Sequence, residues 1–256
     1  MRQVGEKLGW SESKVSRIEL AQHKLSETDL SSVLAILGVT GTEREKLLKL
    51  ARDINQPAWW EFGLDLSPQL TALLGAEQRA VRITQCALHV VPGLLQTRAY
   101  SRALFQCFRT DTDEVDRYIN VRQLRQGNLY RQYPVELVAY LDESVLQRPV
   151  GSPQVMVEQL RHLHHMSNGE NIALHIIPLS AGAHTGLQGG FVLLDFVRDR
   201  SIVHVEQRHT SAFFDDADDV APFKTAAADL RKVAMPQSDS TEFIADYVRK
   251  HESEAG

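Results

Sequence analysis

A short polar segment near the N-terminus, SESKVSRIE at residues 11–19, has the residue types that read a base sequence. Arg17 could donate two parallel hydrogen bonds to O6 and N7 of a guanine, and Glu12 could accept one from N4 of a cytosine. Lys14 and Ser16 suit phosphate oxygens, which fix the register of a protein on the duplex without specifying sequence. The candidate DNA-contacting residues are therefore Glu12, Ser13, Lys14, Ser16 and Arg17.

The neighbouring residues predict the turn and the helix that would position this segment. Gly9 can adopt the left-handed conformation that ends one helix, and Ser11 is a favourable N-cap for the next. Val15 and Ile18 face away from the polar residues. Such a helix, packed by its apolar side on a preceding helix, is typical of the second half of a helix-turn-helix. An ordinary amphipathic hairpin with a solvated face fits the same pattern.

The distribution of charge is compatible with DNA binding by the N-terminal region. The net charge of −5 over the 256 residues argues mildly against non-specific attraction to phosphates. Residues 1–26 nevertheless carry five basic residues against three acidic ones, and the acidity lies downstream, notably in FFDDADD at 213–219. The chain therefore combines a slightly basic head with an acidic body.

The composition indicates a globular protein of the cytoplasm. No apolar run approaches the roughly 18 residues that cross a bilayer, and the N-terminus MRQVGEKLGW lacks the apolar core of a signal peptide. Cys86 and Cys107 cannot form a disulfide framework or a metal site by themselves. We expect both thiols to be reduced.

The first part of the chain is predicted to be helical. Apolar residues recur at helical spacing in DLSSVLAILGV at 29–39, and a further helix is expected over 42–55, opened by Thr42 with Glu45 as a capping box. Pro and Gly in NQPAWWEFG at 55–63 mark a domain joint. The predicted domains are therefore 1–56, a helix-turn-helix domain, and 57–256.

The larger domain mixes helices and strands. Helices are expected across the seventies, and over 97–108, 113–131, 153–167, 219–233 and 240–251. Strands are expected at VELVAYL (135–141), NIALHIIP (171–178), GGFVLLDF (189–196) and SIVHVEQ (201–207). The fold class is therefore α+β, an all-α N-terminal domain followed by a larger mixed α+β domain.

LGWSESKVSRIE followed by DLSSVLAILGV closely resembles the phage-repressor-like (XRE) helix-turn-helix family over residues 2–40. The resemblance implies that Glu12, Ser13 and Arg17 are the base-reading positions. In that family a whole helix precedes this point, and Glu19 matches a glutamate that pairs with an arginine on that helix. We therefore expect either that the true start of the protein lies upstream or that this first helix has been lost.

A second resemblance covers most of residues 57–245. It is carried by VVPGLLQTRAYSRALF (90–105), VRQLRQGNL (121–129), LDESVLQRPVG (141–151), VEQLRHL (157–163) and AGAHTGLQGGFVLLDF (181–196). This order of motifs resembles the domain that follows the head in the WhiJ-like group of bacterial regulators. That group resembles antitoxins, and the resemblance implies a small protein partner encoded by an adjacent gene.

Three residues of the larger domain could bind a partner or a ligand. Arg122 and Arg125 lie one turn apart and could bind an anionic ligand or an acidic surface, unless they are solvated and paired with acids such as Glu114 or Asp116. His184 lies in the Gly-rich segment AGAHTGLQGG, which could approach a ligand closely or simply connect two strands.

Metal binding and catalysis are not expected. His162, His165 and Glu158 share one face of a predicted helix, but a zinc site needs further ligands from elsewhere. Asp142 and Glu143 are adjacent and so do not face each other as an acid–base pair. We expect no cofactor and no enzymatic activity.

These observations together predict a sequence-specific transcriptional regulator that binds double-stranded DNA as a homodimer. The C-terminal domain would respond to a small partner protein or a ligand. Two alternatives stay open: a protein-interaction module that titrates a partner while its head is vestigial, and a small-molecule sensor whose ligand lies behind AGAHTGLQGG.

Overall fold

The computed structural model describes residues 2–19, 26–55, 66–108, 111–207 and 210–255. The chain divides into two compact units, Met1–Leu64 and Asp65–Gly256, which we describe separately. From residue 56 onward, the segment predicted as the domain joint lies outside the described residues.

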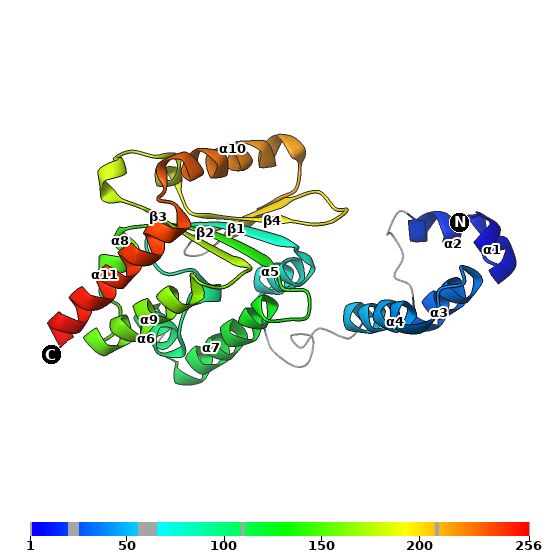
Figure 1. Ribbon diagram of the computed structural model, residues 1–256, viewed down its shortest axis with the longest axis horizontal. Helices are drawn as coiled ribbons and strands as arrows, with labels where there is room; N and C mark the ends of the chain where they lie inside the picture. The colour runs from blue at the N-terminus through cyan, green and yellow to red at the C-terminus, as the bar shows by residue number, and fades with distance from the viewer. Residues whose placement is uncertain (1, 20–25, 56–65, 109–110, 208–209, 256) are drawn as a thin grey trace. The chain divides into compact units, whose positions relative to one another are not determined.

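The described part of the N-terminal unit forms four helices (Figure 1). They are α1 (Arg2–Leu8), α2 (Glu12–Glu19), α3 (Glu27–Ile36) and α4 (Gly41–Asn55). Both helices expected after the polar segment are therefore present. Their apolar residues form a small core of Val15, Ile18, Val33, Leu34 and Leu48.

The C-terminal unit contains a six-stranded mixed sheet in the order β3-β2-β1-β4-β5-β6. The strands are β1 (Arg82–Ala87), β2 (Glu136–Asp142), β3 (Ile172–Ile177), β4 (Phe191–Asp195), β5 (Ile202–Glu206) and β6 (Ser211–Phe214). Strands β1 to β3 are parallel, and β4, β5 and β6 add on antiparallel. The four predicted strands are confirmed, whereas β1 and β6 were not predicted.

Helices cover both faces of this sheet. They are α5 (Pro68–Arg79), α6 (Arg98–Phe108), α7 (Thr112–Gln126), α8 (Ser144–Gln147), α9 (Pro153–Met166), α10 (Ala217–Val233) and α11 (Gln237–Ala255). Short 3-10 turns occupy Gly93–Leu95, Gly127–Leu129, Leu179–Ala181 and Thr185–Gln188. Helix α10 lies on one face and α5, α6, α7 and α9 on the other (Figure 1). The predicted α+β class is thus confirmed.

Alternation along the strands builds two cores, because successive side chains of a strand point to opposite faces. Ile83 and Leu137 belong to the larger core, beneath α9 and α11. Cys86 and Tyr140 belong to the smaller core, beneath α10.

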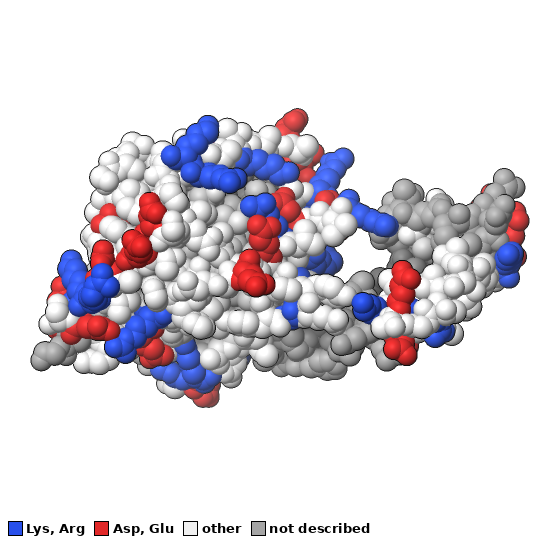
Figure 2. Space-filling view, in the orientation of Figure 1, with Lys and Arg blue, Asp and Glu red and all other residues white. Residues whose placement is uncertain are grey.

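The visible surface of this unit mixes charges of both signs. In Figure 2 several basic side chains lie together over α10, and basic and acidic side chains are mixed on the lower part of the face. None of the described helices is long and apolar enough to cross a membrane.

Candidate functional site

The turn between α1 and α2 has the geometry that its residues predict. Gly9 is left-handed, with φ of 65°. The Trp10 N–H donates to the Gly5 carbonyl oxygen at 2.9 Å, and the Gly9 N–H donates to that of Glu6 at 3.3 Å, which is the hydrogen-bond pattern of a Schellman cap. The Ser11 hydroxyl then accepts from the Lys14 N–H at 3.2 Å and caps α2. The predictions for Gly9 and Ser11 are confirmed.

Helices α1 and α2 approach each other closely at a glycine. A Cβ placed on Gly5 would lie 2.5 Å from Cγ2 of Val15. Val15 and Ile18 are both buried, which confirms the predicted apolar side of α2. The close packing therefore depends on the absence of a side chain at position 5.

The opposite side of α2 carries the predicted DNA contacts. Glu12 and Ser16 are exposed. The side chains of Ser13 and Arg17 lie outside the described residues, so their assignment as base readers stays a prediction.

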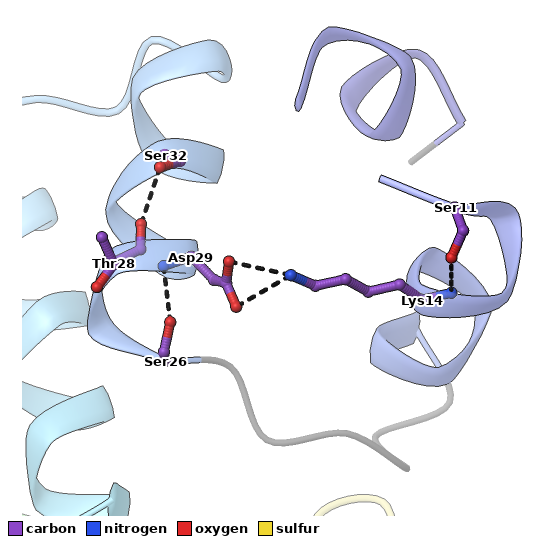
Figure 3. A network of polar contacts seen from close by, with 6 residues as sticks. All are labelled: Ser11, Lys14, Ser26, Thr28, Asp29 and Ser32. Carbon is purple, nitrogen blue, oxygen red and sulfur yellow. Dashed lines mark hydrogen bonds and ion pairs between the residues drawn. The ribbon is translucent and has the colours of Figure 1, made fainter. Parts of the chain in front are cut away.

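Lys14 is held by an acidic residue of α3. Its ammonium lies 3.1 and 3.2 Å from the two carboxylate oxygens of Asp29, as Figure 3 shows. It also lies 4.1 Å from the centre of the Trp10 ring. About a quarter of each charged side chain remains exposed, 28% for Lys14 and 26% for Asp29. A phosphate at Lys14 would therefore compete with Asp29.

Arg125 forms a buried ion pair across the larger domain. Its Nε and Nη2 donate to the Glu77 carboxylate at 2.9 and 2.6 Å, and the two side chains are 14% and 2% exposed. Burial by itself would lower the pKa of Arg125, but Glu77 raises it overall. The sequence suggested pairing with Glu114 or Asp116, yet Asp116 binds Arg102. Arg125 thus fastens α7 to α5.

Arg122 has no carboxylate partner within ion-pair distance among the described residues. Its Nη1 donates to the Gln96 amide oxygen at 2.5 Å, and its guanidinium carbon lies 4.4 Å from the centre of the Phe105 ring. Its Nε is buried without a hydrogen-bond partner. Burial, with a smaller effect of Arg125, lowers the pKa of Arg122 to about 9. At neutral pH it is therefore a buried cation whose nearby carboxylates, Glu206 and Glu77, raise its pKa without contacting it as an ion pair.

Side chains of α7 and α9 hydrogen-bond to the backbone of the motif VVPGLLQT and hold it in place. Gln126 donates to the carbonyl oxygens of Gly93 and Gln96 at 3.2 and 2.7 Å. Gln159, which is fully buried, donates to that of Leu95 at 2.8 Å. These amides satisfy backbone groups that no strand or helix could pair. The motif therefore contributes to the architecture around Arg122.

His184 lies in a polar cluster that the sequence did not reveal. Its Nε2 is 3.4 Å from Oδ2 of Asp142, and its Nδ1 is buried without a partner. A Cβ on Gly186 would lie 2.9 Å from the Cys86 sulfur and 3.0 Å from the His184 Nδ1, so thiol and imidazole flank this glycine. Burial, and to a lesser extent Asp142, raises the pKa of Cys86 to about 12. The thiol stays protonated and is therefore a poor nucleophile.

A cavity of about 360 Å³ lies beside Arg122 and Arg125. Residues of α5, α6, α7, β5 and β6 line it, among them Leu70, Phe105, Tyr118, Arg122, His204 and Ser211. A more open hollow of about 430 Å³ adjoins His184 and Lys232, on the side of the Gly-rich segment. Among the described residues, no three His, Cys, Asp or Glu side chains gather in a metal-binding arrangement.

Comparisons with known protein families match the N-terminal and the C-terminal unit of the chain separately. A family described as Helix-turn-helix domain matches residues 1–47, and the family described as Domain of unknown function (DUF5753) matches residues 70–246. No curated protein and no solved structure matches the chain. The N-terminal region is therefore a helix-turn-helix domain of the kind found in DNA-binding regulators, and the chain, matched over more than half its length, belongs to the DUF5753 family.

Proposed function

We propose that this protein is a sequence-specific transcriptional regulator of the phage-repressor-like (XRE) type. The observation that carries the proposal is the division of α2 into a buried side, Val15 and Ile18, and an exposed side with Glu12 and Ser16. This is the arrangement by which a recognition helix presents its first turns to the major groove. Base contacts fall to Glu12, Ser13 and Arg17, and backbone contacts to Lys14 and Ser16.

The proposal includes a homodimer on a near-palindromic site. Half-sites would be separated by one helical turn of DNA or a multiple of it, because a two-fold dimer presents two recognition helices to one face of the duplex. The larger domain would receive the regulatory signal from a small protein partner, as in antitoxin-like regulators, or from a ligand.

We also propose that the chain is not an enzyme. Cys86, His184 and Asp142 are the residues that most resemble a catalytic set, but the raised pKa of Cys86 supports a protonated, buried thiol. A thiol nucleophile needs the opposite shift, a lowered pKa that yields thiolate at neutral pH.

The direct test is a genomic DNA pull-down with the intact chain, sequenced and repeated at two salt concentrations. Enrichment of one near-palindromic motif that persists at the higher salt supports the proposal. Binding that disappears uniformly with salt contradicts it, because purely electrostatic binding carries no sequence preference. In that event, capture of a partner without DNA would favour the interaction module.

Arg17→Ala provides the residue-level test. We expect it to weaken binding to the enriched motif by roughly 1–3 kcal/mol and to relax the preference at one base pair, as the loss of a bidentate guanine contact does. The measurement is a titration against the motif and its single-base variants. An equal loss on every sequence would remove Arg17 from the base readers.

A further inference from the structure

Two residues that line the cavity beside α7 each carry a buried polar atom without a hydrogen-bond partner in the described part of the chain. Among the described residues, three buried side-chain nitrogen or oxygen atoms have no hydrogen-bond partner. Two of them, Nε of Arg122 and Oγ of Ser211, belong to residues that line this cavity. Because buried polar groups in native proteins are nearly always paired, these two atoms show that the polar residues of this wall are not fully satisfied within the described chain.

Among the described residues around the cavity, Arg122 is a cation without a carboxylate at ion-pair distance. Arg125 is neutralised by its bidentate contact with Glu77. Arg122 donates to the neutral amide of Gln96 and lies over the aromatic ring of Phe105. Burial lowers the pKa of His204, so its imidazole is neutral at physiological pH. Glu206 also lines the cavity; it is exposed, so water weakens its charge without removing it, and it raises the pKa of Arg122 and of His204.

Part of the lining is apolar and aromatic, beside polar residues such as Gln69, Gln207 and Thr210. Leu70 and Leu73 come from α5, and Phe105 and Tyr118 from α6 and α7. The two rings lie 5.6 Å apart between centroids, and the Arg122 guanidinium lies over Phe105. A flat apolar group could stack on these surfaces while an attached anion faces Arg122.

We propose that this cavity binds a small organic monoanion, a carboxylate on a flat apolar body, through Arg122. A carboxylate accepts strong hydrogen bonds from a guanidinium and would supply Arg122 with a counterion at hydrogen-bond distance. A single negative charge fits better than a phosphate dianion, because Arg122 is one cation and the nearby Glu206 would repel further negative charge. The role of this ligand as a signal that controls DNA binding rests on the proposed function, whereas its binding to the cavity can be measured without DNA.

The test uses the intact chain and matched pairs of probes. Benzoate, phenylacetate and 3-phenylpropionate are titrated by calorimetry against their amides, which keep the shape and lose the charge. We expect at least one acid to bind about tenfold or more tightly than its amide, since a hydrogen bond to a charged group contributes about 1.4 kcal/mol or more. Inorganic phosphate should bind more weakly than that acid. Equal affinity of every acid and its amide would overturn the proposal.

Two substitutions with opposite effects locate the site. Arg122→Gln should abolish the preference for the acid, and Glu206→Gln should strengthen acid binding several-fold while leaving the amide unchanged. Arg161→Gln is the control, because Arg161 is exposed on α9, pairs with Glu252 and lies outside the cavity. Arg122 also supports Gln96, so its replacement could unfold the domain. Glu206→Gln avoids that difficulty, and unchanged acid binding in this variant would contradict the site.

The same preparation separates this inference from the proposed function. If the chain binds no acid but still binds a DNA motif specifically, the ligand proposal is wrong and the proposed function stands. If the chain binds an acid through Arg122 but binds no DNA motif, the proposed regulatory function is wrong and the ligand site stands.

Discussion

At the scale of single residues, Lys14 has two competing partners, the Asp29 carboxylate that it contacts and the DNA phosphate that we predict. A partly exposed ion pair of this kind contributes only about 0.2–1 kcal/mol. Lys14 can therefore leave Asp29 for a DNA phosphate at a small cost in free energy. We expect the Asp29 carboxylate to lower the affinity for DNA by competing for Lys14.

Two substitutions test this competition. Lys14→Met should weaken binding to all DNA sequences alike and flatten the salt dependence by about one phosphate contact. Asp29→Asn should strengthen binding and steepen the salt dependence, because it releases the ammonium. Glu43→Gln, an exposed acid in the first turn of α4, changes the net charge equally and controls for bulk electrostatics. If both variants bind less tightly at an unchanged salt slope, Lys14 serves only to hold α2 to α3.

His204 gives a second prediction, on acid stability. Burial lowers its pKa below the ordinary value, with Glu206 opposing and Arg125 supporting the shift. The unfolded chain therefore binds a proton at His204 more readily than the folded chain does, so acid favours unfolding. The free energy of unfolding is at its full value above the unfolded pKa of about 6.5 and declines as the pH falls toward the lower folded pKa.

We expect His204→Gln to reduce this loss. The measurement is the free energy of unfolding by denaturant on either side of pH about 6.5 in both proteins. His162 should contribute in the same direction, since burial lowers its pKa as well, so His162→Gln is the informative companion. An identical pH dependence in the parent and in His204→Gln would show that His204 does not titrate in this way.

At the scale of elements, the packing of α1 on α2 depends on Gly5. Gly5→Ala should raise the intrinsic helix propensity by about 1 kcal/mol. The added methyl, 2.5 Å from Cγ2 of Val15, should cost about 1–3 kcal/mol by overpacking. We expect lower stability of the helix-turn-helix domain and weaker DNA binding.

A double variant and a control complete this test. Val15→Ala removes the contacted methyl, so the Gly5→Ala/Val15→Ala pair should lose less stability than the sum of the single changes. Gly75→Ala, in α5 with nothing within 4 Å of the new Cβ, should instead stabilise the chain slightly. Additive losses in the double variant would mean that the steric contact does not limit the packing.

The elements also show where sequence reasoning succeeds. Segments with strong apolar runs, such as the β2 and β3 sequences, were predicted as strands. The β1 sequence RITQCA carries Arg82, Thr84 and Gln85, and its extended state comes from pairing with β2 and β4 on both sides. Such pairing is tertiary and leaves little trace in the sequence. Strand β6 is short and half-buried, which weakens its signal further.

The candidate sites follow the same rule. The turn at Gly9 and the cap at Ser11 depend on adjacent residues, and the sequence predicted both. The partner of Arg125 lies 48 residues away, on α5, whereas the sequence offered only acids on the same helix. The cluster of Cys86, Asp142 and His184 likewise joins distant segments, so no local pattern could indicate it.

At the scale of the whole molecule, the two inferences together predict coupling between ligand and DNA. If the acid bound at Arg122 alters the affinity for the DNA motif, the motif must alter the affinity for the acid by the same factor, commonly about 5- to 150-fold. We expect this reciprocity in the intact chain and its loss in Arg122→Gln, with DNA affinity otherwise retained. Identical DNA titrations with and without saturating acid would separate the cavity from the regulation of DNA binding.

The Glu77–Arg125 bridge also limits how this sequence can evolve. Replacing one partner alone leaves a buried charge without compensation and costs several kcal/mol, about 3–5. Replacing both with apolar residues of similar volume can be neutral. A viable path between these two states therefore needs both substitutions in quick succession, or a third change that tolerates the intermediate. Positions 77 and 125 should consequently vary together among descendants of this protein, either as an ion pair or as two apolar residues.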